Sequence, residues 1–87
     1  MPTDEEQAER GAKRLMLRLP ALRRQIEVLV SNGEICALCT AFEDATTTLD
    51  RLRKEKASTV IIRDYEQICA EIECEVVALC KEAFDRQ

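Results

Sequence analysis

Apolar residues recur every three or four positions in three stretches of this chain, which are separated by Ser31-Asn32-Gly33 and by Ala57-Ser58-Thr59. This spacing places apolar side chains on one face of a helix, since successive residues turn by about 100°. The sequence therefore predicts an all-α fold, a three-helix antiparallel bundle with long helices at about residues 4–31, 34–56 and 59–85. The three apolar series are Ala8, Ala12, Leu15, Leu19, Leu22, Ile26 and Leu29; Ile35, Leu38, Phe42, Ala45, Leu49 and Leu52; and Ile61, Tyr65, Ile68, Ile72, Val76, Leu79 and Ala83.

The first helix is expected to begin after Thr3, whose hydroxyl suits an N-cap. Pro20 lies inside the helix, where proline removes a backbone donor and disfavours helical geometry at Leu19. The apolar series nevertheless continues from Leu15 through Leu19 to Leu22. We therefore expect one helix kinked at Pro20 rather than two separate helices.

The length and composition favour one domain that is stabilised by self-association. Eighty-seven residues suffice for a single hydrophobic core, and we take residues 1–87 as one domain. Hydrophobic residues make up 46% of the chain, but the aromatic ones are only Phe42, Tyr65 and Phe84. Leu, Ile, Val, Ala and Cys bury less area per residue than aromatic side chains do. A homodimer would offset that shortfall.

Several classes of function are disfavoured by residues that the chain lacks. It contains no histidine, the commonest general base and zinc ligand. Its only glycines are Gly11 and Gly33, so no glycine-rich phosphate-binding loop is present. We therefore expect neither an enzyme nor a cofactor.

No membrane segment is expected either. No apolar run approaches the roughly 20 residues that a spanning helix needs. The acidic start of the sequence, with Asp4, Glu5 and Glu6, is unlike the basic start of a signal peptide. The sequence therefore predicts a cytoplasmic protein without a membrane partner.

The five cysteines are odd in number and irregularly spaced, which favours reduced thiols. Cys36 and Cys39 form a CxxC at the start of the second helix, where the helix dipole lowers the pKa of a thiol. A thiol-redox or soft-metal site for copper or zinc at these two residues is therefore an alternative function. A four-thiolate zinc site is disfavoured, because Cys74 projects away from Cys69 and Cys80 on the third helix.

Apolar residues outside the main series indicate a docking surface. Leu17, Ala21 and Val28 lie opposite the main series of the first helix, and one partner helix cannot cover both sides. On the third helix a second stripe lies beside the main series. This stripe comprises Ile62, Cys69, Val77, Cys80 and Phe84. The partner-binding residues that we predict are Leu17, Arg18, Val28, Val77 and Phe84.

Charge is segregated along the chain. Residues 10–24 carry six basic residues and no acid, whereas residues 25–87 carry seven bases and thirteen acids. The favoured interpretation is that the basic first helix and the acidic third helix neutralise each other. A third functional hypothesis is nucleic-acid binding by a basic surface. It would use Arg14, Arg18, Arg23 and Arg24. The net charge of −4 and the lack of interleaved aromatic residues disfavour this hypothesis.

Glu71 and Glu75 lie one helical turn apart and should repel each other weakly. An external cation or a basic partner would relieve this repulsion, although a solvated charged face is the more ordinary explanation. Together these features predict a small non-enzymatic adaptor or regulator, which acts by docking amphipathic helices on a partner protein.

Overall fold

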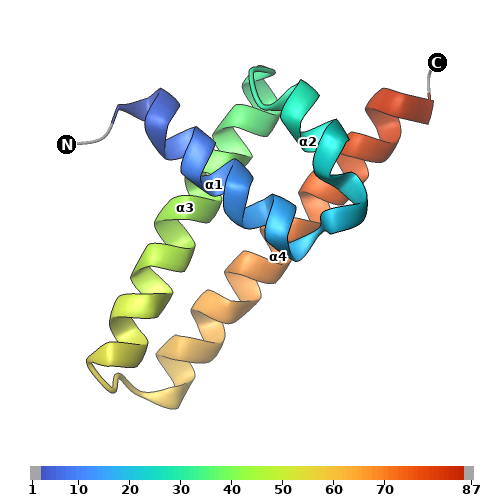
Figure 1. Cartoon of the computed structure of the whole chain (residues 1–87). Coiled ribbons are helices and arrows are strands. Elements are labelled where there is room, and N and C mark those ends of the chain that lie inside the picture. Colours follow the sequence, from blue (N-terminus) through green and yellow to red (C-terminus); the bar gives the residue numbers. More distant parts are fainter. Residues whose placement is uncertain (1–2, 86–87) are drawn as a thin grey trace.

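The computed structural model describes residues 3–85 of the chain, and the side chains of residues 3–84. This part of the chain contains four α-helices and no strand, so the all-α prediction is confirmed (Figure 1). The helices are α1 (Asp4–Arg18), α2 (Arg23–Leu29), α3 (Gly33–Lys54) and α4 (Thr59–Asp85), with a short 3₁₀ turn at Pro20–Leu22.

The prediction of a single kinked helix over residues 4–31 is wrong, because the chain breaks at Pro20 and turns back (Figure 1). Leu19 adopts a non-helical backbone, with φ −128° and ψ 64°, as expected for a residue that precedes proline. The apolar series crosses the break because α1 and α2 both contribute to one core, through Leu15 and Ile26 respectively. The continuous spacing of the apolar residues therefore indicates that α1 and α2 share a core. It does not indicate one continuous helix.

The α3–α4 hairpin forms a V, on which α1 and α2 lie as a second layer (Figure 1). The two long helices meet at the turn after Lys54 and diverge towards the other end, where α2 lies. Helix α1 crosses α3, which is its main packing partner. We call the side of the hairpin that carries α1 and α2 the front face, and the opposite side the back face.

The helix ends are fixed by local hydrogen bonds. The Thr3 hydroxyl accepts from the backbone N–H of Glu6 at 3.2 Å, which confirms the predicted N-cap. Asn32 caps α3, because its side-chain oxygen accepts from the N–H of Glu34 at 3.0 Å. Two residues after the end of α3, Lys56 adopts the left-handed region at φ 56°. The N–H of Lys56 then bonds the carbonyl of Arg53, as in a Schellman motif without its usual glycine.

The core-facing side of α4 is rotated from the predicted series. Cys69 and Cys80, which belong to the second stripe, are buried, whereas Ile61 and Ile68 of the main series are 44% and 41% exposed. Helix α4 contacts α3 on one side and α2 on another, so its buried arc is centred between the two stripes. Ile61 and Ile68 are left as an apolar edge.

Helix α1 approaches α3 closely because small residues lie at the crossing. Ala8, Gly11 and Ala12 are all buried there. A Cβ atom added to Gly11 would lie 1.8 Å from the carbonyl oxygen of Cys39, which no side chain can tolerate. The crossing therefore requires glycine at position 11, a requirement that the sequence analysis missed.

The described residues include no helix that is both long and apolar enough to cross a membrane.

Candidate docking surfaces

A groove on the front face lies where α1, α3 and α4 meet, and we call it the front groove. It has a volume of about 360 Å³. Phe42, Leu49 and Cys69 line it and are almost completely buried, and Leu17 lies at its edge with 83% of its surface exposed. The front groove therefore has an apolar floor beside the end of α1 and charged residues around it.

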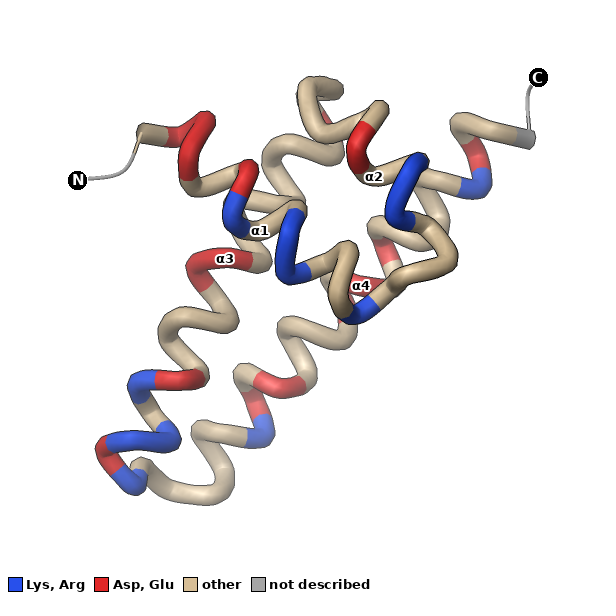
Figure 2. Tube along the Cα trace, in the orientation of Figure 1, with Lys and Arg blue, Asp and Glu red and all other residues tan. Residues whose placement is uncertain are grey.

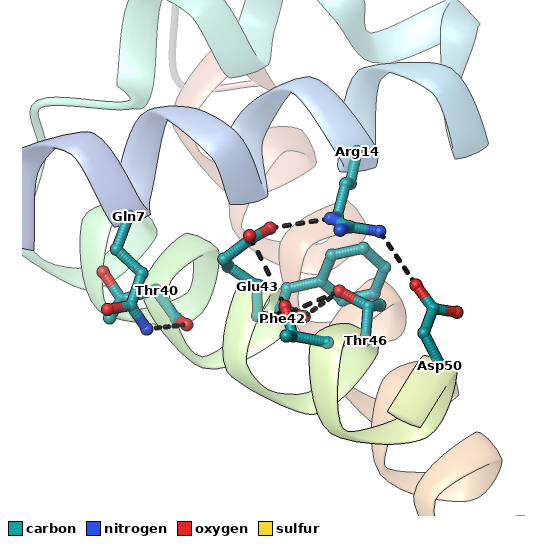
Figure 3. Close-up of polar contacts among 8 residues, drawn as sticks. Gln7, Arg14, Thr40, Phe42, Glu43, Thr46 and Asp50 are labelled. Carbon is teal, nitrogen blue, oxygen red and sulfur yellow. Dashed lines mark hydrogen bonds and ion pairs between the residues drawn. The ribbon is translucent and has the colours of Figure 1, made fainter. Parts of the chain in front are cut away.

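Ion pairs within the chain neutralise the charged residues around the front groove. Arg14 donates through Nε to Glu43 at 2.7 Å and also lies 3.7 Å from Asp50 (Figure 3). Arg18 pairs with Glu73 at 2.7 Å, and Arg53 pairs with Glu66 at 3.1 Å. The Arg14–Glu43 pair joins α1 to α3, and the Arg18–Glu73 pair joins α1 to α4. The Arg18–Glu73 pair is of the kind expected between the first and third predicted helices, whereas Arg14 pairs with residues of the second predicted helix.

The Arg14–Glu43 pair is the most protected of these contacts, since the Glu43 side chain is only 12% exposed. Its other carboxylate oxygen lies 3.5 Å from the Thr47 hydroxyl, which donates to the backbone carbonyl of Glu43 at 2.6 Å. Gln7, two helical turns before Arg14 on α1, donates to the carbonyl of Thr40 at 3.3 Å (Figure 3). Polar contacts therefore attach α1 to α3 on both sides of the Gly11 crossing.

A second groove lies on the back face and is formed by α3 and α4 alone, and we call it the back groove. Its lining consists of Glu34, Ala37, Leu38, Glu75, Ala78 and Leu79. It has a volume of about 480 Å³ and includes no basic residue. Among residues 3–84, no ion pair involves Glu34 or Glu75. The back groove therefore presents an apolar floor between two acidic residues that lack a cation.

The apolar edge of α4 continues the back groove towards the hairpin turn. Ile61, Ile68 and Glu75 are spaced seven residues apart, so they lie in one row along the helix.

The clustered glutamates Glu71, Glu73 and Glu75 have different surroundings in the structure. Glu73 pairs with Arg18 on the front face, whereas Glu71 accepts only a weak hydrogen bond from Gln67 at 3.4 Å. The expected repulsion between Glu71 and Glu75 is thus not relieved by a base among the described residues.

The structure brings together only two of the predicted partner-binding residues. Leu17 and Arg18 both line the front groove, but Arg18 is already paired with Glu73. Val28 and Phe84 are 67% and 37% exposed, and Val77 is half-buried. Neither groove includes Val28, Val77 or Phe84.

The back groove was missed because its residues look unremarkable in the sequence. Ala37 and Ala78 are small, and Leu38 and Leu79 belong to the predicted core series. One signal was present. Helix α3 carries Ala37, Ala41 and Ala45 at four-residue spacing, a pattern that lets another helix approach closely.

The cysteines are mostly buried. Cys39 is fully buried, and desolvation raises its pKa from 9.0 to about 11, with smaller contributions from Cys36 and Cys80. Burial also raises the pKa of Cys69 and of Cys80. Cys36 is half-buried, and Cys74 is exposed. In the described part of the chain, no group of three or more Cys, Asp or Glu residues could hold a metal ion.

The four arginines of the predicted basic surface do not share one environment. Arg14 and Arg18 pair with Glu43 and Glu73, as described above. Arg23 and Arg24 are exposed and belong to the short helix α2, whose basic positions are blue in Figure 2. Half of the expected positive charge is therefore neutralised within the chain.

No family model matches this chain, and no curated protein or solved structure matches it. The functional proposal therefore rests on the chemistry of the two grooves.

Proposed function

We propose that this chain is a small non-enzymatic interaction module, an adaptor or regulator that binds amphipathic helices of a partner protein in its back groove. One observation carries the proposal. The back groove combines an apolar floor with Glu34 and Glu75, which have no basic partner among residues 3–84. A helix that brings apolar side chains and a cation to this surface gains contacts on both counts.

The shape of the back groove suits a helix. Ala37 and Ala78 are exposed and small, so a helix backbone can approach them closely. Leu38 and Leu79 are partly exposed between them and offer the apolar contact area. The exposed Ile61 and Ile68 extend that area along α4. We propose that self-association, with a homodimer as its smallest form, covers these surfaces.

The front groove is a weaker candidate for the same role. Its charged residues are already paired with each other, so a charged partner gains nothing without breaking those pairs. Two of the pairs also attach α1 to the hairpin. We therefore assign the front groove to the stability of the fold.

The thiol and nucleic-acid alternatives have less support. A reactive thiol needs to ionise, and burial of Cys39 opposes ionisation by raising its pKa to about 11. A nucleic-acid surface needs unpaired basic residues, and two of the four predicted arginines are paired. The odd number of cysteines is in keeping with the reducing cytoplasm, which we propose as the compartment.

The test is a comparison of two matched variants. Ala78→Glu places a third carboxylate in the back groove, and Ala70→Glu places one in the front groove, at positions that are both exposed on α4. Each protein is immobilised and used to capture proteins from the source cell, with quantitative mass spectrometry as the readout. We expect partners that bind wild type and Ala70→Glu but are lost with Ala78→Glu.

A captured set that responds to Ala70→Glu and not to Ala78→Glu would move the docking site to the front face. Equal capture by all three proteins would refute the proposal. Circular dichroism of each variant verifies that both remain helical.

A further inference from the structure

The outer face of α1 has the features that the back groove lacks. Leu17, at 83% exposed, is the most exposed of the large apolar residues that the structure describes. Arg10 and Lys13 precede it by seven and four residues, so the three side chains share one stripe of α1. Among residues 3–84, no ion pair involves Arg10 or Lys13. We call this stripe the basic knob.

The basic knob and the back groove are complementary in charge and polarity. The knob has one protruding leucine and two cations, and the groove has two leucines and two carboxylates. Helix α1, which carries several basic residues, lies on the front face of the hairpin (Figure 2), whereas residues of α3 and α4 alone line the back groove. Because the two surfaces lie on opposite faces, a molecule cannot bring its own knob into its own groove.

We infer that the partner in the back groove is α1 of a second copy of this chain. Leu17 of one copy packs between Leu38 and Leu79 of the next, and Lys13 and Arg10 face Glu75 and Glu34. This inference rests on the proposed function and specifies the partner.

The placement of the two surfaces determines the kind of assembly. An interface between two different patches is heterologous, and each added copy leaves a free knob at one end and a free groove at the other. The assembly therefore grows beyond a dimer as concentration rises, unless it closes into a ring. Its ion pairs are exposed at the interface edge, so added salt weakens it.

Sedimentation velocity under reducing conditions gives the first test. The wild-type chain should increase in average mass with concentration and pass the dimer mass. Leu17→Ser removes the knob, and Ala78→Glu blocks the groove. Each substitution should weaken self-association at least tenfold. Val28→Ser is the matched control, since Val28 is a similarly exposed apolar residue outside both grooves.

Mixing the two variants gives the sharper test. The Leu17→Ser protein keeps an intact groove, and the Ala78→Glu protein keeps an intact knob. A 1:1 mixture should therefore form a heterodimer that does not grow further, at concentrations where each variant alone is expected to be monomeric.

A wild-type chain that stays monomeric at all concentrations would overturn the inference. A mixture of variants that remains monomeric would also overturn it. If the wild type is monomeric but still captures partners that Ala78→Glu loses, the back groove binds another protein, and only the identity of the partner is wrong. If neither association nor capture depends on Ala78, the proposed function fails as well.

Discussion

The two faces of the α3–α4 hairpin carry similar residues but differ in how their charges are satisfied. On the front face, Arg14 and Arg18 of α1 neutralise Glu43 and Glu73 of the hairpin. On the back face, Glu34 and Glu75 border an apolar groove without any cation among residues 3–84. The ion pairs of the front face therefore attach α1 to the hairpin, and we call this contact the α1–hairpin interface. The back face has the chemistry of a surface that binds a partner.

This difference shows that acidic residues on one helix need not share one role. Glu73 and Glu75 are two residues apart, which turns them to different sides of α4. Glu73 helps to hold α1, whereas Glu75 remains without a base. The ion pair that an acidic residue makes therefore indicates its role better than its place in an acidic stretch of sequence does.

The largest expected effect comes from a substitution that disrupts the packing of α1 on α3. Gly11→Ala places a Cβ against the carbonyl oxygen of Cys39, so α1 must move away from α3. We expect a loss of about 3 kcal/mol or more in the free energy of unfolding, measured by urea denaturation. Gly33→Ala is the control, because open space surrounds Gly33 and its φ is not positive. It should be neutral or stabilise by up to about 1 kcal/mol. Equal effects of both substitutions would contradict the close crossing.

The second largest effect comes from removing one ion pair between α1 and α3. Arg14→Ala leaves the nearly buried carboxylate of Glu43 without its cation, which should cost about 2 kcal/mol. Arg53→Ala breaks a pair whose side chains are both about half exposed, and it should cost less than about 0.5 kcal/mol. Denaturant titration of both variants compares the two costs. If Arg14→Ala is as mild as Arg53→Ala, the α1–α3 pair is not structural.

The third effect tests the buried thiols at the core. Since the folded pKa of Cys39 is about 11 and its ordinary value is 9.0, the unfolded thiol ionises first as pH rises. The contribution of Cys39 is complete below about pH 9 and is lost as pH rises to about 11, by up to about 1.4 kcal/mol per pH unit. Unfolding free energies across this range should fall less steeply for Cys39→Ala. Cys74→Ala, at an exposed position, should leave the slope unchanged.

The smallest effect compares the two glutamates directly. Glu75→Gln relieves repulsion with Glu71 and should stabilise the monomer by a few tenths of a kcal/mol at low salt. Glu73→Gln weakens the pair with Arg18 and should destabilise it by under about 1 kcal/mol. Thermal unfolding at low and high salt measures both changes. The same sign for both substitutions would remove the distinction between the faces.

The helices were largely predictable from the sequence, because their apolar spacing and the cap at Thr3 are local signals. The break at Pro20 was predicted as a kink, since an apolar series cannot distinguish one bent helix from two that share a core. The left-handed backbone at Lys56 could not be predicted from the sequence, because no glycine occupies that position. The importance of Gly11 depends on contact with α3, which no local pattern reports.

The candidate sites were less predictable than the fold. The exposed positions of Leu17 and Val28 follow from helix geometry, and they lie where the sequence placed them. The back groove depends on which side of α4 faces the core, and that orientation is set jointly by α2 and α3. Only the tertiary arrangement brings Ala37 and Ala78 into one groove.

The most direct test of the account is a dilution series followed by the backbone amide resonances of the wild-type chain under reducing conditions. If the back face is the binding surface, the resonances that shift with concentration should belong to residues 34–38 and 75–79 and to residues 10–17 of α1. Those of Thr46, Leu49 and Ala70 in the front groove should stay constant. Shifts at Thr46, Leu49 and Ala70 without shifts at residues 34–38 and 75–79, or no shifts at any concentration, would contradict the assignment of the back face to self-association.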